Sequence, residues 1–370
     1  MAHFVSSWFG RSVSTSATGV SASGPQRLKV RRPRLALEGA PAKRPHFTPS
    51  NQEAVTSIPG ARLKRAQSWA CQFQKIDVAA IVQCSADVVV IDSGPDGEPD
   101  RPFKPVEVEA MRQGHSGPKT LIAYMSIGEA EQNRFYWNKS WCDKHCHKTR
   151  KAPPWLDRLN ADGWEGNWSI RFWDSGWQAN IIDRPDSFLN RIIDQGFDGV
   201  FLDVIDAFIY WSDTDRGKDR RETAGQDMIA FVSRIAEHAR VVRNKPDFLI
   251  MPLNGDALLQ DANYRAVISV VAKEDVLFRM VGRADAKPKL AERPRTGEDG
   301  LDQIMRHLRQ AQADSIPILD LEYILDWPKD AAQIPTLVPR MRALGLVPHF
   351  THRALGELCP VVPVTTANVS

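Results

Sequence analysis

Short apolar runs that end in polar residues recur along the chain from Trp69 onward. Runs of this length, bounded by polar or turn-forming residues, are typical of strands that are buried on both faces of a parallel sheet. The pattern predicts eight strands, at residues 70–73, 88–92, 121–125, 199–203, 248–252, 267–271, 316–320 and 346–350.

Amphipathic segments separate several of these predicted strands. The clearest runs from Met228 to Val242, where apolar residues recur at the i, i+3, i+4 and i+7 positions of one helical face. Strands that alternate with helices imply parallel strands with right-handed crossovers, and eight such units predict a (β/α)8 TIM barrel. Further helices are predicted at residues 103–114, 186–195, 299–312 and 330–344.

An open doubly wound sheet is the alternative α/β architecture. Open sheets that bind nucleotides usually carry a glycine-rich turn after the first strand. The residues at that point are Gln72-Phe73-Gln74-Lys75, which contain no glycine. The barrel is therefore the favoured fold.

The first 65 residues differ in character from the rest of the chain. They are rich in serine, proline, glycine and arginine and show no sustained hydrophobic period, so residues 1–65 are predicted to form a disordered tail. The barrel domain is expected at residues 66–362, with a C-terminal tail at 363–370.

The positive charge of the chain is concentrated in the N-terminal tail. Residues 1–50 contain eight Lys or Arg residues and one acid, Glu38, whereas the whole chain carries a net charge of +3. The tail therefore accounts for +7, and the remaining residues carry −4. A mildly acidic body argues against nucleic-acid binding, which needs cations clustered on a folded surface.

No stretch of the sequence approaches the roughly 18 uninterrupted apolar residues that a membrane-spanning helix requires. Polar residues also interrupt residues 1–24 too often for the apolar core of a secretory signal peptide, so the sequence alone assigns no compartment. The five cysteines are too few and too scattered for a disulfide framework.

Acidic residues stand at the carboxyl ends of several predicted strands. Asp92 and Asp203 end their strands, Glu274 follows the sixth strand and Glu322 lies just past the seventh. Barrel enzymes place catalytic groups at this rim. Two carboxyl groups that face each other there suit glycoside cleavage, because one protonates the leaving oxygen while the other attacks or activates water. Asp203 and Glu274 form the best candidate pair.

Each of these acids also has a purely structural interpretation. A carboxylate at the end of a strand often caps the next helix or accepts hydrogen bonds from loop N–H groups. Both interpretations apply to Asp206, which either holds a substrate hydroxyl or ammonium group or caps a helix.

Tryptophan is concentrated in a segment after the third predicted strand. Seven of the 11 tryptophans fall between residues 137 and 177. This predicts a Trp-rich insertion, in which most indoles fill a core while one or two of Trp137, Trp173 and Trp177 contact a sugar ligand.

The run Cys142-Asp143-Lys144-His145-Cys146-His147 has the residue types of a metal site. Zinc sites usually draw their ligands from two separated pairs, and no second pair lies nearby in the sequence. A surface loop or a local disulfide is therefore the preferred interpretation.

Several motifs, in chain order, carry a family resemblance. The segment YMSIGEAE at residues 124–131, followed by Arg134 and Tyr136-Trp137, closely resembles the Y-x-S-I-G-E-A-E…R-x-Y-W segment of the endo-α-1,4-polygalactosaminidases of glycoside-hydrolase family 114. Further matches are Arg171-Phe172-Trp173-Asp174 with Trp177, the run GFDGVFLDVID at 196–206, Asn254-Gly255, Glu274-Asp275 and Glu322-Tyr323. The matches cover essentially the whole predicted barrel.

The resemblance implies a TIM barrel that cleaves α-1,4 linkages inside galactosamine-containing polysaccharide with retention of configuration. It implies Glu274 as the acid/base and Asp203 as the nucleophile, although the reversed roles remain open. Carboxylates in the sugar site would favour the cationic amine of deacetylated galactosamine. The implied sugar site comprises Asp92, Tyr124, Glu129, Asn254 and Tyr323, and we add Trp137, Trp173, Trp177, Asp206 and Glu322.

The resemblance implies no metal or organic cofactor, a polysaccharide partner, and a secreted or surface-attached protein like its relatives. We expect a monomer. The alternative function is a non-catalytic, glycan-binding TIM barrel whose Trp-rich insertion holds a glycan without turnover.

Overall fold

The computed structural model describes residues 63–362, except for residues 99, 160–165, 282–288 and 298. Most of the predicted N-terminal tail and the whole predicted C-terminal tail at 363–370 lie outside the described residues. Leu63 is 1% exposed and packs inside the folded body, which therefore begins before the predicted boundary at residue 66.

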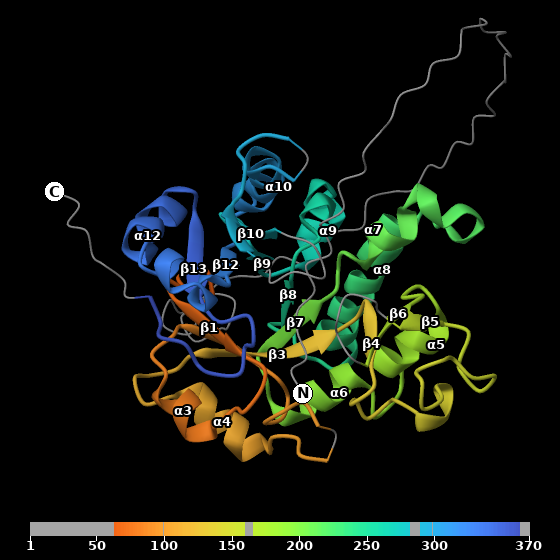
Figure 1. Ribbon diagram of the computed structural model, residues 1–370. Coiled ribbons are helices and arrows are strands. Elements are labelled where there is room, and N and C mark those ends of the chain that lie inside the picture. The colour runs from red at the N-terminus through yellow and green to blue at the C-terminus, as the bar shows by residue number, and fades with distance from the viewer. Residues whose placement is uncertain (1–62, 99, 160–165, 282–288, 298, 363–370) are drawn as a thin grey trace, which may run out of the picture.

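Parallel strands form the barrel that the alternation of strands and helices predicts (Figure 1). These strands are β1 (Trp69–Gln72), β2 (Val88–Ile91), β3 (Thr120–Ser126), β7 (Gly199–Asp203), β8 (Leu249–Pro252), β9 (Val271–Glu274), β12 (Ile318–Glu322) and β13 (Leu346–Phe350). They pair in the orders β1-β2-β3-β7-β8 and β13-β12-β9. A parallel bridge between Leu253 and Ala272 joins β8 to β9, and the indole N–H of Trp69 donates to the carbonyl of Val347 at 2.9 Å, between β1 and β13.

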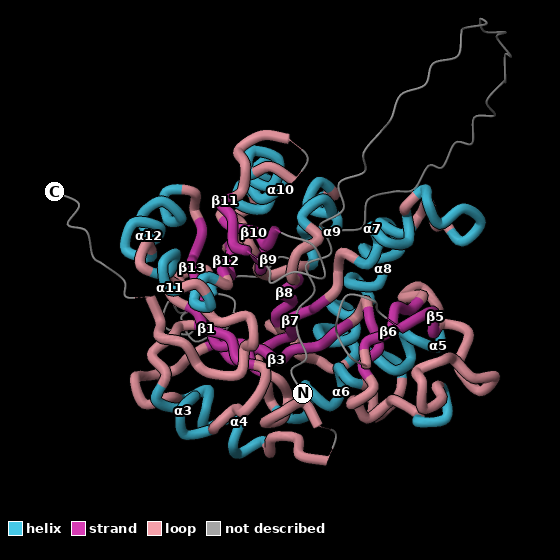
Figure 2. The backbone as a smooth tube through the Cα atoms, in the orientation of Figure 1, coloured by secondary structure: helices cyan, strands magenta, loops and turns pink. Residues whose placement is uncertain are grey.

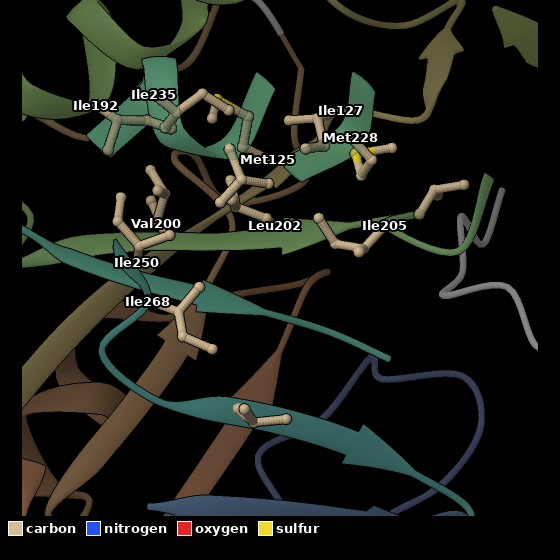
Figure 3. Packing of buried hydrophobic residues seen from close by; sticks show 14 of the residues in the cluster. Met125, Ile127, Ile192, Val200, Leu202, Ile205, Met228, Ile235, Ile250 and Ile268 are labelled. Atoms are coloured by element: carbon tan, nitrogen blue, oxygen red, sulfur yellow. The ribbon is translucent and has the colours of Figure 1, made fainter. Parts of the chain in front are cut away.

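The alternation of side chains along each strand divides the core into two layers. One set, which includes Val90 and Phe201, fills the inside of the barrel. The other set packs against the surrounding helices, and Figure 3 shows Val200 and Leu202 of β7 in this outer layer together with Ile192. Because successive strand residues face opposite sides, parity decides which strand-terminal residues reach the barrel mouth.

Helices surround the strands (Figure 2). All five predicted helices are present, as α4 (Pro105–Gln113), α6 (Phe188–Gln195), α8 (Ala224–Glu237), α10 (Leu301–Ala313) and α12 (Ile334–Ala343). Shorter helical segments are α3 (Val78–Gln83), η1 (Lys139–Trp141), α5 (Ser175–Gln178), η2 (Ala179–Asp183), α7 (Ala207–Ser212), η3 (Thr214–Asp219), η4 (His238–Val242), η5 (Asp256–Gln260), α9 (Ala262–Val267), η6 (Ile324–Asp326) and α11 (Pro328–Ala331).

Local sequence sets the ends of these helices, as α6 illustrates. The hydroxyl of Ser187 accepts a hydrogen bond from the N–H of Asn190 at the N-terminus, and Gly196 adopts the left-handed conformation at the C-terminus. The predicted apolar face is buried along α8 and as far as Ala239 in the π-helical turn η4, whereas Val242, the last residue of η4, is 67% exposed. The predicted single helix to Val242 was therefore wrong at its end.

Two predicted strands are displaced along the sequence. The run 267–271 begins with the last residue of α9, so the strand starts only at Val271 and ends at Glu274. The strand predicted at 316–320 extends from Ile318 to Glu322. Glu274 and Glu322 are therefore the last residues of their strands and do not follow them. The first displacement arises because an apolar run does not by itself distinguish the end of a helix from a strand.

The insertion predicted after the third strand forms a separate antiparallel sheet. Its strands are β4 (Glu129–Glu131), β5 (Leu156–Leu159) and β6 (Asn167–Ile170), in the order β4-β6-β5. Indoles pack together in this insertion. Trp141 lies edge to face on Trp155 with ring centroids 5.1 Å apart, and Trp155 lies tilted on Trp177 with centroids 5.0 Å apart. Trp164 lies outside the described residues.

A hairpin of β10 (Phe278–Val281) and β11 (Lys289–Glu292) follows β9, and the sequence pattern did not predict it. The loop at 142–147 lies on the surface of the insertion, and Cys142 and Cys146 are free rather than joined by a local disulfide. Within the described residues, no helix combines the length and apolar character needed to cross a membrane.

Candidate active site

Asp203 is the last residue of β7 and points into the barrel mouth. Its Oδ2 accepts a hydrogen bond from the hydroxyl of Tyr124 at 2.8 Å, and its Oδ1 accepts one from the backbone N–H of Val204 at 2.8 Å. The side chain is buried, and so is that of Tyr124 on the neighbouring strand β3. Two donors thus fix the orientation of this carboxylate.

Glu274 occupies the equivalent place on β9, which is separated from β7 by β8. Its Oε1 accepts a hydrogen bond from the hydroxyl of Tyr323, and its Oε2 accepts one from the side-chain amide of Asn254 at 2.7 Å. The oxygen of the same amide accepts from the backbone N–H of Glu274 at 3.2 Å. Each candidate carboxylate therefore has a tyrosine donor and a second donor.

The two carboxyl groups interact electrostatically. Burial raises the pKa of Asp203 well above its usual range, and the charge of Glu274 raises it further, against the hydrogen bond from Tyr124. Burial likewise raises the pKa of Glu274, while the hydrogen bonds from Tyr323 and Asn254 and the charge of Lys273 lower it. Two buried carboxyl groups that repel each other hold one proton more readily than none.

A chain of polar contacts continues from Glu274 away from the barrel axis. The ammonium group of Lys273 donates to the Oδ1 of Asn254 at 3.0 Å and lies 3.5 Å from an oxygen of Asp256. The other oxygen of Asp256 lies 2.7 Å from the Nδ1 of His307 on α10. Burial would raise the pKa of Asp256, but Lys273 and His307 lower it below its usual range. This chain fixes the amide that orients Glu274.

A pocket of about 190 Å³ opens beside this chain. Its wall includes Asp206, Asn254, Lys273, Glu274 and Asp275. Asp206 stands at the start of α7 but makes no helix-capping hydrogen bond with its side chain. Burial raises its pKa to about 7, and Lys273 opposes that rise. The helix-cap interpretation of Asp206 is therefore wrong. A wider cleft of about 980 Å³ between α10 and α12 contains neither candidate catalytic acid.

Two of the predicted site acids, Asp92 after β2 and Glu129 in β4, bind side chains of the insertion. Asp92 directly follows β2, and its Oδ2 forms a buried ion pair with Arg134 at 2.8 Å. The Nε of the same guanidinium bonds Glu131 at 2.7 Å, and its Cζ lies 5.4 Å from the ring centroid of Tyr124. Glu129 is buried and accepts a long hydrogen bond from Asn167 at 3.4 Å. Arg134 thus links the base of the insertion to the barrel mouth.

Three residues at the rim adopt the left-handed backbone conformation although none is glycine. They are Val204 after β7, Asn254 after β8 and Asp275 after β9, with φ of 58°, 60° and 55°. For the β-branched Val204 this conformation is an outlier, and such strain is held only where the surroundings fix it. The strain turns the chain sharply at the three strand ends that carry the candidate site.

Two glycines make room for the turn after Asp203. A Cβ atom on Gly128 would lie 2.0 Å from the carbonyl oxygen of Val204, and one on Gly255 would lie 2.4 Å from Cγ2 of Ile205. Gly128 is the glycine of the SIGEAE motif, so the motif includes a steric requirement of the turn after Asp203.

Several predicted site residues do not meet the carboxylate pair. Glu322 faces outward from β12, and its oxygens accept from the N–H groups of Leu277 at 2.6 Å and Phe278 at 3.3 Å. Glu322 therefore makes the contacts of the structural interpretation, in which a strand-end carboxylate accepts hydrogen bonds from loop N–H groups. Trp177 is buried and donates to the carbonyl of Ile127 at 2.9 Å, so it belongs to the core.

The two remaining tryptophans are half-buried. Trp137 packs on Trp141, with ring centroids 5.1 Å apart. Trp173 packs on Trp211 at 4.9 Å, and the guanidinium of Arg221 lies 4.5 Å from its ring centroid. Neither lines the pocket beside Glu274.

Lys273, Asp256 and His307 were missed by sequence reasoning. Lys273 directly precedes a predicted catalytic residue, which is the one available signal for it. Asp256 and His307 come from segments 51 residues apart, and only the fold brings them together.

Comparison with known sequences and structures identifies related proteins. The family model for glycoside-hydrolase family GH114 matches residues 48–364. An uncharacterized protein of Deinococcus radiodurans is 31% identical over 322 residues, which cover 86% of this chain and 88% of that protein. A Thermotoga maritima protein, also uncharacterized, is 35% identical over 213 residues, which cover 57% of this chain and 60% of that protein.

Two solved structures share the barrel. The glycoside hydrolase domain of PelA from Pseudomonas aeruginosa aligns with a TM-score of 0.57 at 22% identity, covering 79% of this chain and 97% of that domain. Ega3 of Aspergillus fumigatus, in complex with galactosamine, aligns with a TM-score of 0.51 at 16% identity, covering 80% of this chain and 95% of that one. These likenesses confirm the TIM-barrel fold.

Proposed function

Because the chain belongs to glycoside-hydrolase family GH114 and is therefore a glycoside hydrolase, we propose that it cleaves α-1,4 linkages inside galactosamine-containing polysaccharide with retention of configuration. Asp203 and Glu274 are the proposed catalytic pair. The observation that carries this proposal is the arrangement of two buried carboxyl groups on β7 and β9, each held by a tyrosine hydroxyl and coupled through their charges.

In the proposed first step Glu274 donates its proton to the glycosidic oxygen while an oxygen of Asp203 attacks the anomeric carbon. The glycosidic bond breaks, and a covalent glycosyl–Asp203 ester forms. In the second step Glu274 takes a proton from water, the water oxygen attacks the anomeric carbon, and Asp203 leaves as a carboxylate. This sequence needs a carboxyl separation of about 5–5.5 Å, against about 6.5–9.5 Å for inversion.

The hydrogen bonds support a fixed geometry for both groups. Asp203 accepts from Tyr124 and from the backbone N–H of Val204, so its attacking oxygen is held in one direction. Burial raises the pKa of both carboxyl groups, which favours a pair that carries one proton. The assigned roles require that this proton lie on Glu274 in the first step.

The charge around the pocket supports a cationic amino-sugar as substrate. Five carboxyl groups line its wall against the three cations Lys273, Arg279 and Arg293, and an ammonium group on the sugar would offset the excess of acids. The galactosamine in the Ega3 structure points to the same class of sugar. We propose that Asp92, Tyr124, Glu129, Asn254 and Tyr323 line the remainder of the sugar site, with Trp137 or Trp173 at its edge. We also propose that the protein is a monomer.

The test is reducing-end release from partially deacetylated α-1,4-polygalactosamine by the full chain and by Asp203→Asn and Glu274→Gln variants. We expect each variant to lose activity by at least about 10²–10⁴-fold, which is the usual contribution of a positioned acid or base. Asp247→Asn, at an exposed carboxylate before β8, is the matched control and should retain activity.

The anomeric configuration of the first product, followed by proton NMR, tests retention. The α-anomer is expected before mutarotation. A first product in the β configuration would overturn retention and leave hydrolysis standing. If the folded wild-type protein retained the polymer and released no reducing ends, the non-catalytic glycan-binding barrel would replace the proposal.

A further inference from the structure

The segment after β13 brings three metal-binding side chains together, outside the carboxylate pair. They are His352, Glu357 and Cys359, and one ligand atom from each lies within 4.8 Å of the other two. Cys359 is buried, whereas the side chains of His352 and Glu357 are 34% and 66% exposed. Neither the sequence motifs nor the proposed reaction uses these residues.

The histidine in this cluster is oriented as metal-binding histidines usually are. Its Nδ1 lies 2.9 Å from a carboxylate oxygen of Asp326, and its Nε2 faces Glu357, with the Oε1 of that residue 3.0 Å away. A carboxylate on the far nitrogen of a ligating imidazole fixes its tautomer and raises its basicity. The Nε2 atom is therefore directed toward the side where Glu357 and Cys359 lie.

We propose that His352, Glu357 and Cys359 bind a zinc ion, with Asp326 as the outer partner of the histidine. Imidazole with thiolate selects zinc over magnesium and calcium, which prefer oxygen ligands. Zinc–ligand bonds of about 2.0–2.3 Å place tetrahedral ligand atoms about 3.3–3.8 Å apart. The His352–Glu357 pair at 3.0 Å and the 4.8 Å limit for the whole group bracket that spacing. The exposed side of the cluster leaves the fourth position to water.

Backbone hydrogen bonds hold the first half of this segment, at residues 352–355. The N–H of Leu355 donates to the carbonyl of His352 at 3.1 Å, and the carbonyl of Leu355 accepts from Phe73 after β1 at 2.9 Å. The second oxygen of Asp326 accepts from the N–H of Arg353 at 2.8 Å. A preformed loop lowers the ordering cost of metal binding.

The position of this site gives the zinc a role next to the catalytic rim. Arg353 directly follows the ligand His352, and its guanidinium lies 5.6 Å from the ring centroid of Tyr323. Tyr323 is the donor to Glu274, and Asp326 lies three residues beyond it on η6. Bound zinc would hold residues 352–359 against η6 through His352 and Asp326. It would thereby restrict the movement of Tyr323 without taking part in bond cleavage.

Binding of Zn²⁺ and Co²⁺ alone to the metal-depleted full chain tests the site. We expect about one tightly bound ion per chain and, with Co²⁺, a thiolate-to-metal charge-transfer absorption. Cys359→Ser should abolish that absorption. The double variant Cys142→Ser/Cys146→Ser, in the surface loop of the insertion, is the control and should keep it.

Two further variants keep the test informative if Cys359→Ser does not fold. Glu357→Gln changes an exposed side chain, and Asp326→Asn changes only the outer partner, so each should weaken zinc binding by about 10–100-fold. No charge-transfer absorption in the wild type, or an absorption that survives Cys359→Ser and disappears in the loop double variant, would overturn the proposal. Reducing-end release by the metal-depleted protein is measured separately. Hydrolysis without metal binding would overturn only the zinc proposal, and metal binding without hydrolysis would overturn only the proposed function.

Discussion

The hydroxyl of Tyr124 donates a 2.8 Å hydrogen bond to the Oδ2 of Asp203 inside the barrel mouth. On the opposite side of β8, Tyr323 donates in the same way to Glu274. Both acids are buried, so these phenols, with Val204 N–H and Asn254, replace the water that would otherwise solvate the carboxylates. The predictions below concern the groups that hold the pair.

Tyr124→Phe should lower kcat/KM by about 10–100-fold, because a hydrogen bond to a charged group contributes about 1.5–3 kcal/mol and each 1.4 kcal/mol corresponds to about tenfold in rate. Losing this donor should also raise the pKa of Asp203, so the acidic limb of the pH–rate profile should move to higher pH. Tyr264→Phe, at a buried tyrosine on α9, is the matched control and should leave the limb unchanged. An unshifted limb in Tyr124→Phe would show that Asp203 does not set it.

Lys273→Met should move the alkaline limb of kcat to higher pH. The ammonium group lowers the pKa of Glu274, so its loss raises that pKa and keeps the acid protonated over a wider range. We also expect kcat at the optimum to fall by about tenfold, because Asn254 loses one charged hydrogen bond. The exposed Lys245→Met serves as the comparison. A Lys273→Met profile that matches wild type would refute the proposed coupling.

Asp206→Asn should change the pH dependence of stability. Burial raises the folded-state pKa of Asp206 to about 7, above its unfolded value of about 3.9, so between these two values the native state binds more protons than the unfolded state. The contribution of Asp206 to the free energy of unfolding should therefore decrease as pH rises from about 4 to 7. The variant lacks this contribution, so its stability relative to wild type should increase over the same range.

Urea unfolding of both proteins at several pH values between 4 and 8 measures this difference. Asp247→Asn, at an exposed carboxylate, should run parallel to wild type. If Asp206→Asn also ran parallel, Asp206 would titrate normally in the folded protein.

Gly128→Ala should destabilise the protein by about 1–3 kcal/mol or more and should also reduce activity. Its Cβ atom would collide with the carbonyl of Val204 at 2.0 Å, and relief of that collision must move the residue next to Asp203. Gly225→Ala, on α8, is the control, since its Cβ would meet nothing closer than 3.6 Å and should be neutral or slightly stabilising. Thermal unfolding and reducing-end release report the two effects; an active, equally stable Gly128→Ala would contradict the steric argument.

Much of the barrel could be predicted from the sequence because strands buried on both faces give continuous apolar runs. The strand predicted at 267–271 was displaced since Val267 ends a helix, and an apolar residue is buried equally well in either element. The hairpin β10–β11 was missed because its strands are partly exposed and carry charged residues.

The candidate site was predicted only in part. Strand-terminal acids identified Asp203 and Glu274, but parity separates Glu322 from them: Leu321 and Tyr323 face the barrel interior, so the residue between them must face outward. Asp256 and His307 could not be found from sequence, because their contact depends on how α10 packs beside η5. Tryptophan content indicated an aromatic insertion without distinguishing the core indole of Trp177 from the half-buried ones.

The tight turn at Val204 and Ile205, enclosed by Gly128 and Gly255, limits how substrate preference can be altered in this barrel. Neither Gly128 nor Gly255 has space beside it for an added methyl group. The left-handed conformation of Val204 also fixes the path of the chain immediately after Asp203. Attempts to retarget the enzyme to another sugar would therefore leave residues 203–205 untouched. New specificity would have to be introduced from α7 outward or through the parts of the insertion beyond Arg134.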